Sequence, residues 1–83
     1  MNGIGWAVKQ LWDGKKLKRL GWNGKDMWVA LQIPDEHSMN TEPYVYLERF
    51  GNGVPLDKNK RYRIPWLCSQ SDLLAKDWEI FAD

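Results

Sequence analysis

Apolar residues near the start of the chain recur with the spacing of one helical face. Asn2 is suited to cap such a helix, and Gly14 suits the left-handed position that ends one. The pattern predicts a helix over residues 4–13. Its apolar stripe, which we expect to pack in the core, consists of Ile4, Ala7, Val8, Leu11 and Trp12.

The next segment has the pattern of a hairpin. Residues 15–22 and 27–33 flank Asn23-Gly24, one of the strongest short signals for a tight turn between two strands. In the second strand, alternation directs two sets of side chains to opposite faces. One set is Met27, Val29, Leu31 and Ile33, and the other is Trp28, Ala30 and Gln32.

The remaining pattern predicts further strands and a second short helix. Ser69 can cap that helix, and Asp72 lies three residues on, as in a capping box. Pro65 implies an edge strand or a bulge. The expected elements are a loop at 34–43, strands at 44–50, 61–67 and 78–81, a turn at 51–53, an irregular stretch at 54–60 and a helix at 70–76. Together these elements predict an α+β fold: a small antiparallel β-sheet with two short helices packed on it, in a single compact domain spanning 1–83.

Composition adds an expectation of assembly. Six tryptophans in 83 residues are more aromatic surface than so small a core can bury, so some should lie at a pocket or an interface. The net charge of +1 argues against a protein that tracks a nucleic-acid polymer, which usually carries a strong basic excess. Two local basic clusters have two readings, solvated strand edges or contacts to an anionic ligand. They are Lys15, Lys16, Lys18 and Arg19, and Lys58, Lys60, Arg61 and Arg63.

The residues that carry chemistry are sparse. Cys68 is the one cysteine and His37 the one histidine, so neither a disulfide, a cysteine metal site nor a nucleophile–base pair is indicated. We therefore expect no enzyme, no cofactor and no metal. The chain lacks the pattern of a signal peptide or a membrane span, which makes a cytoplasmic protein the simplest expectation.

Two tryptophans lie where polar residues follow a turn. Trp22 precedes Asn23-Gly24, and Trp66 follows Pro65. A ring in such a place can stack on a nucleotide base, or it can anchor an ordinary tight turn. The residues alone leave both readings open.

The chain resembles a family of small phage and prophage proteins, formerly known as a domain of unknown function: the Thoeris anti-defence proteins of the second type. The resemblance is carried by the segments at 21–25, 27–30, 65–66 and 69–79 and covers nearly the whole chain. The chain departs from the family pattern between Gly51 and Arg63, where relatives more often have a short hairpin.

This resemblance implies a sponge rather than an enzyme. It would bind a cyclic ADP-ribose-type immune signal, of the glycocyclic ADP-ribose class, in pockets of a homo-oligomer, with a tetramer expected. The signal would be sequestered unchanged in the cytoplasm of the infected bacterial host, and the Thoeris effector would stay silent. Some relatives also hold cyclic oligonucleotides.

The resemblance also implies site residues. Trp22 and Trp66 would stack on adenine, and Asn23 and Gln70 would bond base or ribose edges. Asp72 would accept ribose hydroxyls or merely cap its helix. Arg63, or a lysine of the 15–19 run, would balance the diphosphate. The residues expected to bind ligand are Trp22, Asn23, Arg63, Trp66, Ser69, Gln70 and Asp72.

Two other classes of function remain. A protein–protein interaction module, such as a host-enzyme inhibitor, would use the spare tryptophans as interface anchors. A single-stranded nucleic-acid module would use them as stacking plates, but it would need a continuous basic groove.

Overall fold

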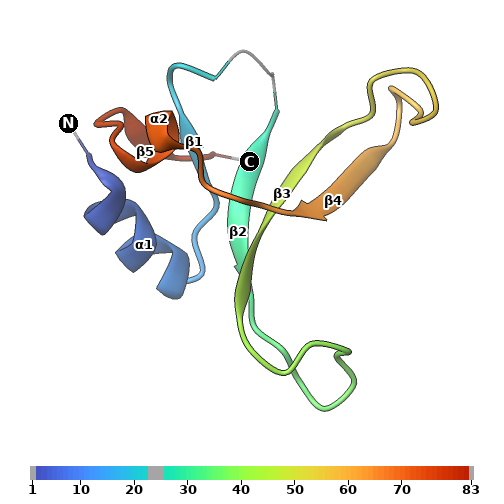
Figure 1. Cartoon of the computed structure of the whole chain (residues 1–83), viewed down its shortest axis with the longest axis horizontal. Coiled ribbons are helices and arrows are strands. Elements are labelled where there is room, and N and C mark those ends of the chain that lie inside the picture. Colours follow the sequence, from blue (N-terminus) through green and yellow to red (C-terminus); the bar gives the residue numbers. More distant parts are fainter. Residues whose placement is uncertain (1, 23–25, 83) are drawn as a thin grey trace.

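A computed structural model describes residues 2–22 and 26–82. Within these residues, five antiparallel strands form one open sheet in the order β4-β3-β2-β1-β5, and two helices accompany it (Figure 1). The predicted α+β class is confirmed. The elements are α1 (Ile4–Trp12), β1 (Leu17–Arg19), β2 (Trp28–Gln32), β3 (Tyr44–Phe50), β4 (Arg61–Pro65), α2 (Gln70–Leu73) and β5 (Trp78–Ile80).

The strand register divides the side chains between two sides of the sheet. Leu17, Val29, Leu47 and Ile64 lie opposite one another across β1, β2, β3 and β4. We call their side the helix side, because Leu17 and Val29 pack with Ala7 and Leu11 of α1. The alternate residues face the other side, the open side. The alternation predicted for 27–33 is confirmed over β2.

The core is the place where α1 lies over the sheet. It consists of Ala7, Leu11, Leu17, Val29 and Trp78, each at most 6% exposed. α1 packs mainly against β1, β2 and β5, which leaves the β3–β4 half of the helix side without a helix over it (Figure 1). The helix then ends as predicted, because Gly14 takes the left-handed conformation, with φ of 83°.

The prediction that Trp12 packs in the core is wrong. Its side chain is 61% exposed, and Val8 on the same stripe is 44% exposed. Each follows a buried residue, Leu11 or Ala7, by one position, which is about 100° around the helix. The sheet beneath α1 covers only the nearer part of the stripe. Trp6, which lies off the stripe, instead packs partly against the core.

Asn2 does not cap α1, contrary to the sequence prediction. Gly3 occupies the cap position, without a side-chain hydrogen bond. Asn2 instead forms a parallel bridge with Asp77, and its side-chain amide donates to the Trp78 carbonyl over 3.1 Å. The Trp78 amide in turn donates to the Asn2 carbonyl over 3.1 Å. Asn2 thus pairs with backbone groups at the free edge of β5, where they would otherwise lack partners.

β1 and β2 pair, but their register is not that of a two-residue hairpin. A turn at residues 23 and 24 would set Lys18 opposite Val29, whereas Leu17 lies there. β1 ends at Arg19 because the Gly21 amide donates to the Asp77 carboxylate over 2.8 Å and so leaves the strand ladder. The predicted Asn23-Gly24 turn itself lies outside the described residues.

Other elements also end earlier than the pattern predicts. α2 stops at Leu73 rather than at residue 76, because the Asp72 carbonyl accepts the indole N–H of Trp78, where the chain turns back to form β5. β4 ends at Pro65 and is an edge strand, as its proline predicted. Residues 51–60 form an irregular loop, in which a side chain at Gly51 would collide with the Asp57 backbone.

Candidate functional site

Three tryptophans meet on the helix side of the sheet. Trp22 lies 5.5 Å from Trp78 and 6.2 Å from Trp66, between ring centroids, and Trp66 lies 5.9 Å from Trp78. All three pairs are edge-to-face, the arrangement that aromatic quadrupoles favour. Trp78 is buried, whereas Trp22 and Trp66 are half-buried. We call this group the tryptophan cluster; its two outer rings retain surface that a ligand can reach.

Asp72 holds the cluster through several hydrogen bonds. Its Oδ1 accepts the Trp22 indole N–H over 3.0 Å and an Arg19 Nη1–H over 2.7 Å. Its Oδ2 accepts the Ser69 hydroxyl over 2.9 Å, and its main-chain carbonyl accepts the Trp78 indole over 3.1 Å. One residue of α2 therefore contacts two of the three tryptophans.

Arg19 joins Asp72 to the chain before β5. Its Nε donates to Asp77 Oδ1 over 2.8 Å, while Nη1 donates to Asp72. Asp77 Oδ2 also accepts the Gly21 amide, and a Cβ at Gly21 would lie 3.1 Å from that oxygen. Arg19, Trp22, Ser69, Asp72 and Asp77 form what we call the Asp72 network.

The electrostatics of the network follow from these contacts. Burial alone raises the pKa of Asp72, but hydrogen bonds from Trp22, Arg19 and Ser69 outweigh it and lower the pKa. The hydrogen bond from Arg19 lowers the pKa of Asp77, and the two carboxylates raise that of Arg19. Both aspartates are therefore charged at neutral pH, and Arg19 is flanked by two negative charges.

The structure brings four of the predicted site residues together: Trp22, Trp66, Ser69 and Asp72. Ser69 caps α2 as predicted, because its Oγ accepts the Asp72 amide over 3.1 Å. Gln70 is exposed on the first turn of α2, next to that cap. Asn23 lies outside the described residues.

Arg63 lies elsewhere. It is opposite Glu48 in the β3–β4 register, on the open side of the sheet, away from the tryptophan cluster. Its Nε donates to Glu48 over 2.7 Å, its guanidinium lies 5.1 Å from the Tyr46 ring, and Arg61 donates to the second Glu48 oxygen. Burial raises the pKa of Glu48, but the two arginines outweigh it and lower the pKa. The structure thus separates Arg63 from the other predicted site residues.

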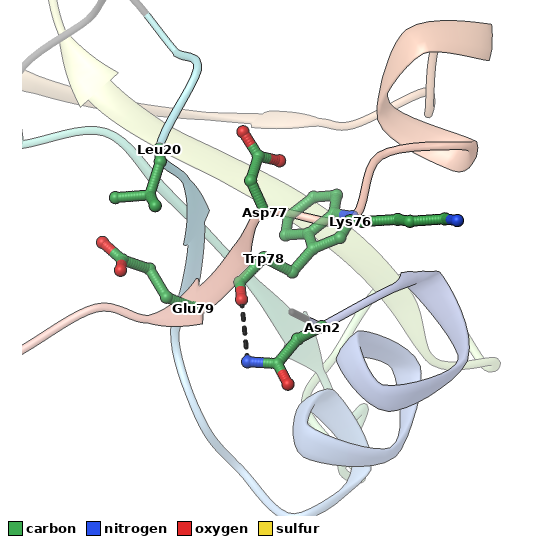
Figure 2. A pocket seen from close by; sticks show the side chains of 6 residues that line it. All are labelled: Asn2, Leu20, Lys76, Asp77, Trp78 and Glu79. Atoms are coloured by element: carbon green, nitrogen blue, oxygen red, sulfur yellow. Dashed lines mark hydrogen bonds between the residues drawn. The ribbon is translucent and has the colours of Figure 1, made fainter.

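Two cavities offer alternative places for a ligand. One, of about 410 Å³, borders the free edge of β5 (Figure 2). It is lined by Asn2, Leu20, Lys76, Asp77, Trp78 and Glu79. The charges of its lining sum to −1, which disfavours an anionic ligand. The other, also of about 410 Å³, lies on the open side, where Lys16 and Arg61 are balanced by Asp26 and Glu48.

The sequence reasoning missed Arg19 and Asp77 as parts of the site. Arg19 was grouped with the basic run that precedes it, and Asp77 had no pattern of its own. Their contact depends on the antiparallel pairing of β1 with β5, which sets Arg19 opposite Trp78. No local sequence signal indicates that pairing.

The described residues add two further observations. Their helices are all too short or too polar to cross a membrane. Over 2–22 and 26–82, no group of three or more histidine, cysteine, aspartate or glutamate side chains has a geometry that could hold a metal ion.

Comparison with known proteins identifies the family. Residues 2–81 match the Thoeris anti-defense 2-like domain. The chain is also 32% identical, over 81 residues, to a protein of Bacillus phage SP01 named Thoeris anti-defense 2; the match covers 93% of this chain and 91% of that protein. A family match over nearly the whole length, together with this relative, shows that the chain belongs to the Thoeris anti-defense 2-like family.

Proposed function

We propose that the chain blocks Thoeris defence by binding a cyclic ADP-ribose-type signal, of the glycocyclic ADP-ribose class, and holding it unchanged. The observation that carries the proposal is family membership over residues 2–81. Because the signal is made inside the infected cell, the proposed place of action is the cytoplasm of the bacterial host.

The tryptophan cluster is the proposed binding site. Trp22 and Trp66 are half-buried and would stack on the adenine, and such stacking contributes about 1–3 kcal/mol per base. Gln70 is exposed beside them and would bond a base or ribose edge. Asn23 is assigned to the same site by its sequence position alone. Arg63 is left out of this site, because it lies on the open side.

Holding without turnover fits the chemistry of the nearby groups. The Ser69 hydroxyl donates to Asp72 and caps α2, so it is occupied by a structural role. Burial and the nearby Asp72 charge raise the pKa of the Cys68 thiol, which disfavours the nucleophilic thiolate. His37 has a side chain that is 85% exposed and pairs with its neighbour Glu36. None of these side chains has the contacts of an activated nucleophile.

The proposal includes assembly into a homo-oligomer, with a tetramer expected. The chain exposes 6167 Å², about 1,000 Å² more than a folded monomer of this length usually does. A stable interface buries about 800 Å² per partner, so the excess is of the right size. Val8, Trp12 and Ile64 are exposed on the helix side, where α1 leaves β3 and β4 uncovered.

A depletion assay tests the proposed function. The purified protein is mixed with an extract of cells that make the Thoeris signal and removed by filtration; the remaining activation of the effector is then measured. We expect activation to fall in proportion to added protein and to return when the retained protein is denatured. Undiminished activation at excess protein would contradict the proposal and would favour a protein partner for the exposed apolar residues.

A further inference from the structure

Within the Asp72 network, the acceptor atoms of Asp72 are already occupied. Oδ1 accepts from Arg19 and from Trp22, Oδ2 accepts from Ser69, and the side chain is 13% exposed. A carboxylate has about four acceptor positions, and three are filled here. A ribose hydroxyl could bind Asp72 only with little access, or by displacing one of these donors.

Arg19 is committed in the same way. Its Nε and Nη1 each donate to a carboxylate at 2.7–2.8 Å, and its side chain is 18% exposed. With two negative partners, its charge is more than balanced, so it is a poor partner for a diphosphate. What Arg19 does achieve is mechanical: it joins β1 to α2 and to the residue that precedes β5.

The group that these contacts orient is Trp22. An indole has a single N–H donor, and that donor is used on Asp72. The hydrogen bond and the edge-to-face contacts with Trp66 and Trp78 together set the plane of the Trp22 ring. The exposed ring surface is the part of Trp22 left for a ligand.

We infer that Arg19 and Asp72 are positioning residues, which orient the Trp22 ring for stacking on the signal and do not themselves contact it. The inference rests on the proposed function and deepens it. Stacking requires a ring held in the correct plane, and a ring held before binding loses less freedom when the ligand arrives. The network therefore contributes to affinity through Trp22 alone.

The first arm of the test needs no ligand. The indole N–H of Trp22 is followed by NMR in the free protein and is assigned by its absence in Trp22→Phe. Arg19→Lys keeps the charge but cannot donate to both aspartates with the planar fork of arginine. We expect the Trp22 signal to shift and its hydrogen exchange to speed up in Arg19→Lys, and to stay unchanged in the control Arg49→Lys. An unchanged signal in Arg19→Lys overturns the inference.

The second arm measures affinity in a double-mutant cycle, with glycocyclic ADP-ribose as the probe in titration calorimetry. Arg19→Lys should weaken binding about tenfold in the wild-type background and by less than about twofold in the Trp22→Phe background, because Arg19 acts through the Trp22 indole. Equal losses in both backgrounds overturn the inference, since a general structural role would be additive. If the wild-type chain does not bind the probe although its Trp22 signal is intact, the proposed function fails, and the purpose assigned to the network fails with it.

Discussion

At the scale of single residues, Trp78 links the core to the candidate site. It is 2% exposed, packs with Leu17 and Val29, and contacts both Trp22 and Trp66. Its indole N–H also donates to Asp72. A change at Trp78 should therefore affect folding first and binding as a consequence.

We predict that Trp78→Ala lowers the free energy of unfolding by about 3–5 kcal/mol, the usual result of truncating a buried aromatic residue. Trp12→Ala should cost less than about 1 kcal/mol at low protein concentration, because Trp12 is 61% exposed. Urea denaturation of both variants in dilute solution gives the comparison. A larger loss for Trp12 than for Trp78 would reverse our assignment of the core.

Sequence reasoning at this scale succeeded where the chemistry is local. The Ser69 cap and its contact with Asp72 follow from two residues three positions apart. Trp12 was misplaced because periodicity marks an apolar stripe but does not show how much of it the sheet covers. Arg19 could not be placed, because its partners are 53 and 58 positions away along the chain.

At the scale of elements, one set of charges joins β1, α2 and β5. Arg19 extends from β1, Asp72 lies on α2, and Asp77 immediately precedes β5. The pKa of each aspartate is lowered in the folded chain. Groups of this kind stabilise the fold above their unfolded pKa, about 3.9 for aspartate, and lose the effect as the pH falls through the folded value.

We therefore predict that stability changes little from about pH 7 to pH 5 and then falls below about pH 4. Glu48, whose pKa is also lowered, should contribute to the same fall. In Asp72→Asn the chain should be less stable at pH 7, and its loss of stability on acidification should be smaller. Thermal unfolding between pH 2 and pH 7 measures both effects; parallel curves for the two proteins would contradict this role of Asp72.

The existence and type of the elements were predictable, but several of their ends were not. Apolar spacing identified both helices and the strands. β1 ended early because Gly21 turns towards Asp77, and α2 ended early because Trp78 takes the carbonyl of Asp72. Both causes are contacts between distant segments. The pairing of Leu17 with Val29 likewise differs from the register that an Asn-Gly turn implies.

At the scale of the whole molecule, the two sides of the sheet differ. The helix side carries the core and the tryptophan cluster, and α1 covers only part of it. The open side is covered by its own long side chains, because Arg61 and Arg63 enclose Glu48 and Lys16 lies 4.5 Å above the Trp28 ring. The sequence could not separate Arg63 from the tryptophans, since the side it faces depends on the strand register.

We predict that the exposed part of the helix side forms the contact between copies of the chain. Trp12→Ser should shift the protein towards monomer while leaving the fold of each copy intact, since an exposed apolar residue at an interface contributes mainly to association. Val54→Ser, at a residue that is 86% exposed in the 51–60 loop, is the control. Light scattering at micromolar concentration distinguishes the outcomes: a wild-type monomer, or equal effects of both substitutions, would contradict this surface.

The central claim is that the chain holds its ligand without changing it. The most direct measurement loads the protein with glycocyclic ADP-ribose, removes free ligand, denatures the protein by heat and analyses the released molecule by mass spectrometry. We predict recovery of the intact cyclic molecule in a fixed ratio to protein, however long the complex has been stored. Recovery of linear ADP-ribose, or consumption of ligand far beyond one equivalent per site, would contradict the claim and show that the chain is an enzyme.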